Sequence, residues 1–146
     1  MLIGIECHDS SRTIFGNLCA IMEVEKYDWY IDDVDCNYFY FRPGKYTGKQ
    51  LIEELETIST LSFVRVWRFP SDTDEALMKE TPMVKYKDFV KSECDLLVLF
   101  YDGGFCEIYS KDESLTHRIM ELCKRNNLKK AEYKYDYNDA RTGMSF

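Results

Sequence analysis

The longest apolar run in the chain is Leu96–Tyr101, within a sequence that otherwise mixes polar and apolar side chains. A membrane-spanning helix needs roughly 20 such residues, whereas a β-strand is typically about five or six residues long. Because apolar side chains stand on both faces of this segment, we expect a central strand that is covered on both sides. The sequence therefore predicts a sheet-based domain and no membrane partner.

Size and composition favour one folded domain over residues 1–146. The chain has 11 Tyr, 9 Phe and 2 Trp but only 7 Gly and 3 Pro, which is unlike a disordered or collagen-like chain. Its length suffices to bury a core without disulfides or metals. The segment Met1–Glu6 has neither the basic nor the long apolar stretch of a secretion signal, so we expect a cytoplasmic location.

The cysteines do not form a metal-binding pattern. They stand at positions 7, 19, 36, 94, 106 and 123, and no pair has the short spacing of a zinc site. In a cytoplasmic chain we expect reduced thiols that pack as small apolar side chains. The sequence predicts no metal and no cofactor.

Hydrophobic periodicity in residues 1–70 predicts the order β-α-β-β-α-β, which is that of a split βαβ unit. The expected strands are 2–7, 27–32, 38–41 and 61–69, and the expected helices are 13–22 and 51–58. The two strands from Tyr27 and Tyr38 are expected to pair as a hairpin. Thr47 and Gln50 have the spacing of a capping box that opens the second helix.

The second half adds a hairpin, a helix and a final strand. We expect a long loop over 71–85 with one helical turn near 74–79, and then a short helix or an edge strand over 86–93. The expected elements that follow are strands 96–101 and 105–109, a helix with a capping box at 110–113, a stop at 126–127, a strand over 131–137 and a loose tail over 139–146. The fold class is α+β, with three helices on a mixed or mostly antiparallel sheet of six to seven strands.

One candidate ligand site lies where the first strand leads into the first helix. It comprises His8, Asp9, Ser10, Ser11 and Arg12. Free N–H groups at a helix start favour anions, and these side chains include acid–base groups. The alternative is that Ser10 or Ser11 caps the helix while His8 faces solvent and Cys7 enters the core.

Acidic residues concentrate near the N-terminus. The net charge is −7, and residues 1–36 hold eight acidic but only two basic side chains. This balance argues against nucleic acid, because phosphate binding requires clustered Lys and Arg. The basic stretch over 124–134 crosses a predicted helix end, where cations complement the helix dipole.

A candidate protein-binding surface combines acidic and aromatic side chains from the predicted hairpin. Its members are Asp28, Tyr30, Asp32, Asp33, Asp35, Tyr38 and Tyr40. The carboxylates lack the Gly and closing Glu of a calcium loop, so we expect a solvated strand edge that blocks aggregation. The tyrosines are expected on the solvent side, where amphipathic rings suit a protein partner.

The opening strand with Gly4 and Ile5, the short helix after it and the segment Tyr27–Ile31 resemble the N-terminal pattern of a family of small bacterial proteins catalogued as a domain of unknown function. The resemblance implies a bacterial, cytoplasmic α+β chain of similar length. It carries over no catalytic or binding residue.

Together these observations favour a non-enzymatic, acidic protein-interaction module of the immunity or regulatory type with a basic protein partner. The alternative is a small-molecule-binding protein or enzyme that uses the turn from His8 to Arg12 and is reached by the loop over 71–85.

Overall fold

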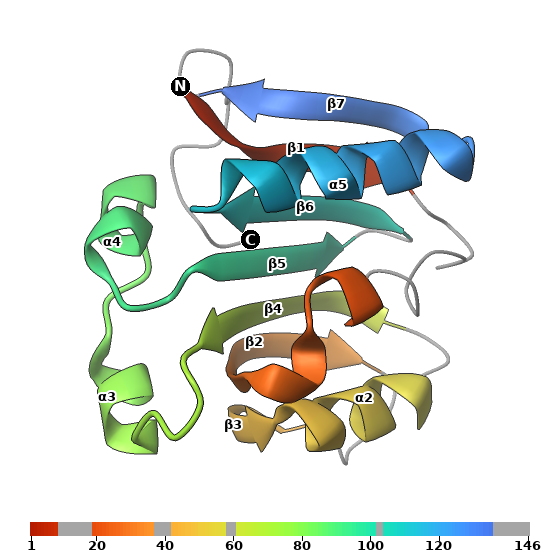
Figure 1. Ribbon diagram of the computed structural model, residues 1–146. Coiled ribbons are helices and arrows are strands. Elements are labelled where there is room, and N and C mark those ends of the chain that lie inside the picture. Colours follow the sequence, from red (N-terminus) through yellow and green to blue (C-terminus); the bar gives the residue numbers. More distant parts are fainter. Residues whose placement is uncertain (9–18, 37–41, 58–60, 102–103, 136–146) are drawn as a thin grey trace.

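The computed structural model describes residues 1–8, 19–36, 42–57, 61–101 and 104–135, with the backbone alone at 33–36, 55–57, 61–63 and 101. Its strands are β1 (Leu2–His8), β2 (Asp28–Cys36), β3 (Gly44–Thr47), β4 (Leu61–Phe69), β5 (Leu96–Tyr101), β6 (Phe105–Ser110) and β7 (Lys129–Tyr135). Its helices are the short 3-10 helix η1 (Val24–Lys26), α2 (Gly48–Thr57), α3 (Glu75–Glu80), α4 (Tyr86–Lys91) and α5 (Glu113–Arg125) (Figure 1).

The seven strands form one sheet in the order β3-β2-β4-β5-β6-β1-β7. Every neighbouring pair runs antiparallel. This confirms the α+β class and the predicted strand number. The apolar run Leu96–Tyr101 is β5, the fourth of the seven strands, as its two apolar faces predicted.

The split βαβ unit predicted for residues 1–70 is wrong. β1 pairs with β6 and β7, whereas β4 pairs with β2 and β5. The first strand therefore closes onto the C-terminal half of the chain. Element order alone could not reveal this, because the pairing of β1 depends on contacts about a hundred residues away in sequence, such as Ile5 opposite Ile108.

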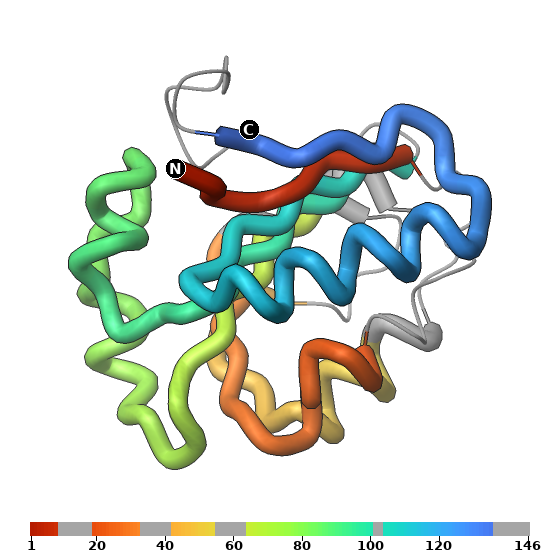
Figure 2. The backbone as a smooth tube through the Cα atoms, turned by 45° about the horizontal axis from the view of Figure 1, so that its top comes forward, coloured from red at the N-terminus to blue at the C-terminus, as the bar shows by residue number. Residues whose placement is uncertain are grey.

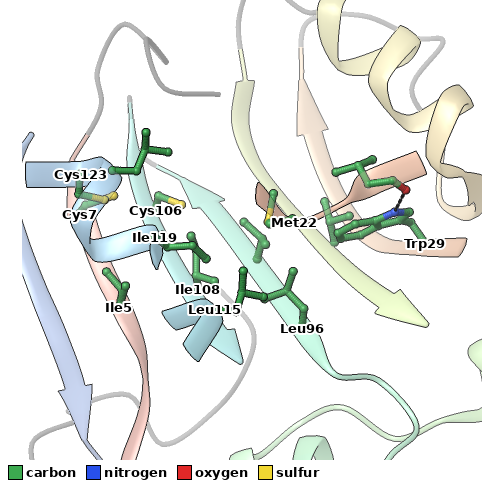
Figure 3. Packing of buried hydrophobic residues seen from close by; sticks show 14 of the residues in the cluster. Ile5, Cys7, Met22, Trp29, Leu96, Cys106, Ile108, Leu115, Ile119 and Cys123 are labelled. Carbon is green, nitrogen blue, oxygen red and sulfur yellow. Dashed lines mark hydrogen bonds between the residues drawn. The ribbon is translucent and has the colours of Figure 1, made fainter. Parts of the chain in front are cut away.

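One sheet face, here called the α5 face, is covered by α5 and by the segment of η1 and α2 (Figure 1). Alternate strand residues point into this layer and form the larger core: Ile5, Cys7, Trp29, Ile31, Val64, Val66, Leu96, Val98, Cys106 and Ile108. From α5 come Leu115, Ile119 and Cys123 (Figure 3). The Trp29 indole satisfies its N–H by donating to the Val24 carbonyl at 3.0 Å.

The opposite face of the sheet carries a second core beneath α3 and α4. Trp67, Phe69, Leu97 and Tyr109 come from the strands, and Met78 and Phe89 come from the two helices. Figure 2 shows α3 and α4 together at one end of the molecule, apart from α5. The two short helices therefore form a separate corner of the fold.

β2 is longer than the pattern indicated. It continues beyond the expected end at residue 32 to Cys36, because a register shift between Ile31 and Asp33 lets it go on pairing with β4. On its other side it pairs with β3, and the expected partner strand 38–41 lies outside the described residues. The capping box is confirmed: Thr47 Oγ1 accepts the Gln50 N–H, and Gln50 Oε1 accepts the Thr47 N–H.

In the second half, the helical turn near 74–79 is confirmed as α3, and 86–93 adopts the helical alternative as α4. The capping box predicted at 110–113 is shifted: the N-cap of α5 is Asp112, whose carboxylate accepts the Leu115 N–H at 3.2 Å. Ser110 Oγ instead accepts the Asp112 N–H. The stop at 126–127 is confirmed by the positive φ of Asn127.

Candidate functional site

The structure describes one of the five residues of the predicted strand-to-helix site. His8 ends β1 and stacks on Phe105 of β6, with ring centroids 4.5 Å apart. Its neighbour Cys7 is buried in the core. Asp9, Ser10, Ser11 and Arg12 lie outside the described residues, so their role as a ligand site stays a prediction.

The predicted acidic and aromatic surface does not have the expected solvent exposure at the positions that the structure describes. β2 pairs with β3 over Asp28–Ile31, so this part of β2 is not the expected solvated strand edge. Asp28 and Tyr30 are each only 8% exposed, and Tyr30 packs edge-on against Trp67 instead of facing solvent. For Asp33 and Asp35 the structure describes the backbone alone, and Tyr38 and Tyr40 lie outside it.

Asp28 and Asp32 serve internal contacts. Asp28 lies 3.4 Å from Lys45 Nζ and accepts the Asp72 N–H at 2.8 Å, which ties the start of the α3 segment to β2. Asp32 accepts from the Arg65 guanidinium and, at 2.8 Å, from the Trp67 indole N–H. Both carboxylates act as anchors within the fold.

Much of the N-terminal acidity is neutralised in this way. Among the side chains that the structure describes, four ion pairs involve acidic residues of the segment 1–36: Asp28 with Lys45, Asp32 with Arg65, Glu23 with Lys26, and Glu6 with Lys134. At these four carboxylates the negative charge is therefore already paired and does not form a free acidic surface.

A buried charge cluster joins β1, β6 and β7 on the sheet face opposite α5. Lys134 Nζ lies 3.5 Å from Glu6 and 3.8 Å from Glu107, and the Tyr109 hydroxyl donates to Glu107 at 3.4 Å. The Lys134 and Glu107 side chains are only 7% and 5% exposed. Such a paired cluster favours one register of the strands, because a shift would leave a buried charge without its partner.

The described residues leave a groove between α3 and α4. It has a volume of about 420 Å³ and is lined by Leu77, Glu80, Thr81, Pro82, Asp88, Lys91, Ser92 and Glu93. Three of these side chains are carboxylates and one is an ammonium, so the lining is net negative. Its apolar part comes from Leu77 and Pro82.

The same corner holds exposed apolar side chains. Leu77, Val84 and Val90 are 44%, 61% and 51% exposed, and Met1 is the remaining large apolar side chain with high exposure among the described residues. On α3 the exposed Leu77 is followed by the fully buried Met78, and on α4 the exposed Val90 follows the fully buried Phe89. The two buried side chains attach the short helices to the core. A six-residue helix that buries one side chain must turn its neighbours outward.

Asp88 fixes the entrance of α4. One oxygen of its carboxylate accepts the N–H groups of Val84 and Lys85, at 3.0 and 2.8 Å. These backbone hydrogen bonds, more than the nearby Lys87 and Lys85, lower the pKa of Asp88 below its ordinary value. The carboxylate is therefore ionised throughout the neutral range and adds negative charge to the groove.

The groove residues were not among the site residues predicted from the sequence. The available signal was the long polar segment 71–85, a length at which loops are often functional. Apolar periodicity could not identify Leu77 or Val90, because each helix is too short to show a repeat. Within the described ranges, no three or more His, Cys, Asp or Glu side chains are placed to hold a metal ion.

Among the described residues, no helix has both the length and the apolar character that are needed to cross a membrane. One curated relative, the uncharacterized protein YncE of Bacillus subtilis (strain 168), is 25% identical over 60 residues, a match that spans 41% of this chain and 39% of that protein. No solved structure matches the chain. The model of one family, described as protein of unknown function (DUF2691), matches residues 2–145, and the chain belongs to this family.

Proposed function

We propose that the chain is a non-enzymatic protein-interaction module that binds a basic protein in the bacterial cytoplasm, in an immunity or regulatory role. The observation that carries the proposal is the corner formed by α3 and α4, where exposed Leu77, Val84 and Val90 accompany a net negative groove. Apolar side chains rimmed by charged ones are typical of protein interfaces.

The net charge of −7 supports a basic partner. A negative chain attracts a positive protein over a distance set by the ionic strength, which raises the association rate. Because ion pairs neutralise several acids of residues 1–36, we place the contact at the α3–α4 corner instead of on β2. Asp33, Asp35, Tyr38 and Tyr40 remain candidates for a second part of the surface.

A small-molecule site at the end of β1 is the second candidate function. His8 and Glu6 are two residues apart on one strand, so they share the sheet face opposite α5, and Glu107 lies directly across from Glu6. Glu107 is buried in the charge cluster with Lys134, whereas the Glu6 side chain is 43% exposed, so the His8 imidazole and the Glu6 carboxylate are the groups that can bind a ligand or exchange protons on this face. This candidate predicts that His8→Ala changes ligand binding and leaves capture of a basic protein unchanged.

The test is affinity capture from a bacterial lysate by the purified chain at about 0.1 M and about 1 M salt, where the Debye length falls from about 10 Å to about 3 Å. We expect a basic protein to be retained at the lower salt only. The matched variant carries Leu77→Ser, Val84→Ser and Val90→Ser, which are exposed positions where substitution leaves the fold intact. We expect it to lose the partner, and capture of no salt-sensitive basic protein by the wild-type chain would reject the proposal.

A further inference from the structure

We propose that the α3–α4 groove receives an Arg or Lys side chain from a basic segment of the partner, with a leucine-like side chain of the same segment packed on Leu77. This inference rests on the proposed function and names the chemistry of its docking site. It commits to a partner segment in which positive and apolar side chains stand close together.

The charges of the groove fit a cation. Glu80 and Glu93 both line it, and neither side-chain carboxylate forms a hydrogen bond or an ion pair with any residue in the described ranges. This differs from Asp28, Asp32 and Glu6, whose carboxylates already have internal cations. Asp88 adds a third carboxylate, while Lys91 supplies the one positive charge of the lining.

The apolar part of the groove fits the stem of such a side chain. Arg and Lys place their methylene groups along apolar surface while the charged end reaches polar groups. Leu77 and Pro82 provide that surface beside the carboxylates. The exposed Val84 follows Pro82 closely along the chain, so a partner segment that enters the groove has a further apolar contact within reach.

Both walls of the groove are fixed before any partner arrives. Asp74 caps α3 by accepting the Ala76 N–H, and the fully buried Met78 fastens this helix to the second core. On α4, the fully buried Phe89 does the same, and Lys111 Nζ donates to the Ser92 carbonyl at 2.7 Å. A preformed groove costs little conformational entropy on binding, which favours affinity for a short segment.

The experiment is an NMR titration of the full chain with an acetylated and amidated peptide of alternating arginine and leucine, compared with its glutamate and leucine counterpart. We expect the largest shift changes at residues 77–82 and 88–93, and binding of the arginine peptide only. Changes of equal size for both peptides, or changes centred elsewhere on the molecule, would overturn the assignment.

Two double variants of equal net charge separate the groove from the general acidity. Glu80→Gln with Glu93→Gln removes groove charge, whereas Glu53→Gln with Glu121→Gln removes exposed charge from α2 and α5. We expect the first pair to raise the Kd for the arginine peptide by about tenfold and the second to change it less than about twofold. Equal losses for the two pairs would show that net charge alone governs binding.

The same variants distinguish the two proposals. If the wild-type chain captures a salt-sensitive basic protein and the Glu80→Gln, Glu93→Gln variant captures it equally, the groove assignment fails and the proposed function stands. If the wild-type chain captures none, the proposed function fails. Sedimentation of the wild-type chain tests a second copy as the occupant: self-association that the groove variant abolishes would overturn the partner assignment.

Discussion

Arg65 on β4 donates hydrogen bonds from two guanidinium nitrogens, Nε and Nη2, to the carboxylate of Asp32 on β2. A third nitrogen of the same side chain, Nη1, donates to the Met83 carbonyl at 2.7 Å, in the link between α3 and α4. The Arg65 side chain thereby connects the sheet to the α3–α4 corner, which we propose as the binding surface.

Removing Asp32 is expected to be costly. Asp32→Ala leaves the buried guanidinium without its main partner and the Trp67 indole without its acceptor, so we expect the free energy of unfolding to fall by about 3 kcal/mol. Urea denaturation measures this. The control is Glu23→Ala, which breaks the exposed pair with Lys26 and should cost less than about 1 kcal/mol. Equal losses for the two variants would contradict this account of the pair.

Gly4 is required because β6 passes too close for a side chain. A Cβ at this position would lie 2.0 Å from the Ile108 carbonyl oxygen, which is backbone and cannot move alone. We expect Gly4→Ala to lower the free energy of unfolding by at least about 2 kcal/mol and to reduce Tm markedly. Ser71→Ala, at an exposed position, is the control. A Tm equal to that of the control would mean that β1 does not pack as described.

Asp88 makes the stability of the α3–α4 corner depend on pH. Its folded-state pKa is lowered by the backbone hydrogen bonds of Lys85 and Val84, so its contribution to stability is present above its ordinary pKa of 3.8 and is lost as the pH falls through the lower folded value. We therefore expect Asp88→Ala to destabilise the chain at pH 7 and the difference from wild type to shrink in acid below pH 3.8. Thermal melts at a series of pH values test this, and a constant difference would contradict it.

The buried thiols are expected to resist alkylation. Burial raises the pKa of Cys94 to about 12, and Cys7, Cys106 and Cys123 are also buried, whereas Cys19 is partly exposed. With iodoacetamide at about pH 8 we expect modification of Cys19 first and of these four cysteines only after unfolding in urea, because the thiolate is the reactive form. Mass spectrometry of the peptides locates the label. Rapid labelling of Cys94 in the folded chain would contradict its placement.

Local patterns proved sufficient for most elements of the fold. The continuous apolar run predicted β5, and the β-branched and aromatic segment before Pro70 predicted β4 with its observed bounds. The Thr47 and Gln50 pair predicted the start of α2. These succeed because period, capping and turn chemistry act over a few residues.

The pairing of strands across the sheet and the burial of charged side chains could not be predicted from local patterns. β1 lies beside β6 and β7 because of contacts between distant segments, and Asp28 and Tyr30 are buried because β3 and the α3 segment cover them. A polar side chain that alternates along a strand has the same pattern whether it meets water or a buried cation. Arg65 and Lys134, the cations that neutralise Asp32 and Glu6, lie far from them in sequence.

The central claim is that the α3–α4 corner binds a basic protein, and hydrogen exchange on the isolated complex tests it most directly. With the captured partner bound at low salt, we predict slower amide exchange over residues 75–93 than in the free chain, and no such change for the variant with serine at 77, 84 and 90. Slower exchange confined to α5 and β7, with 75–93 unchanged, would contradict the account.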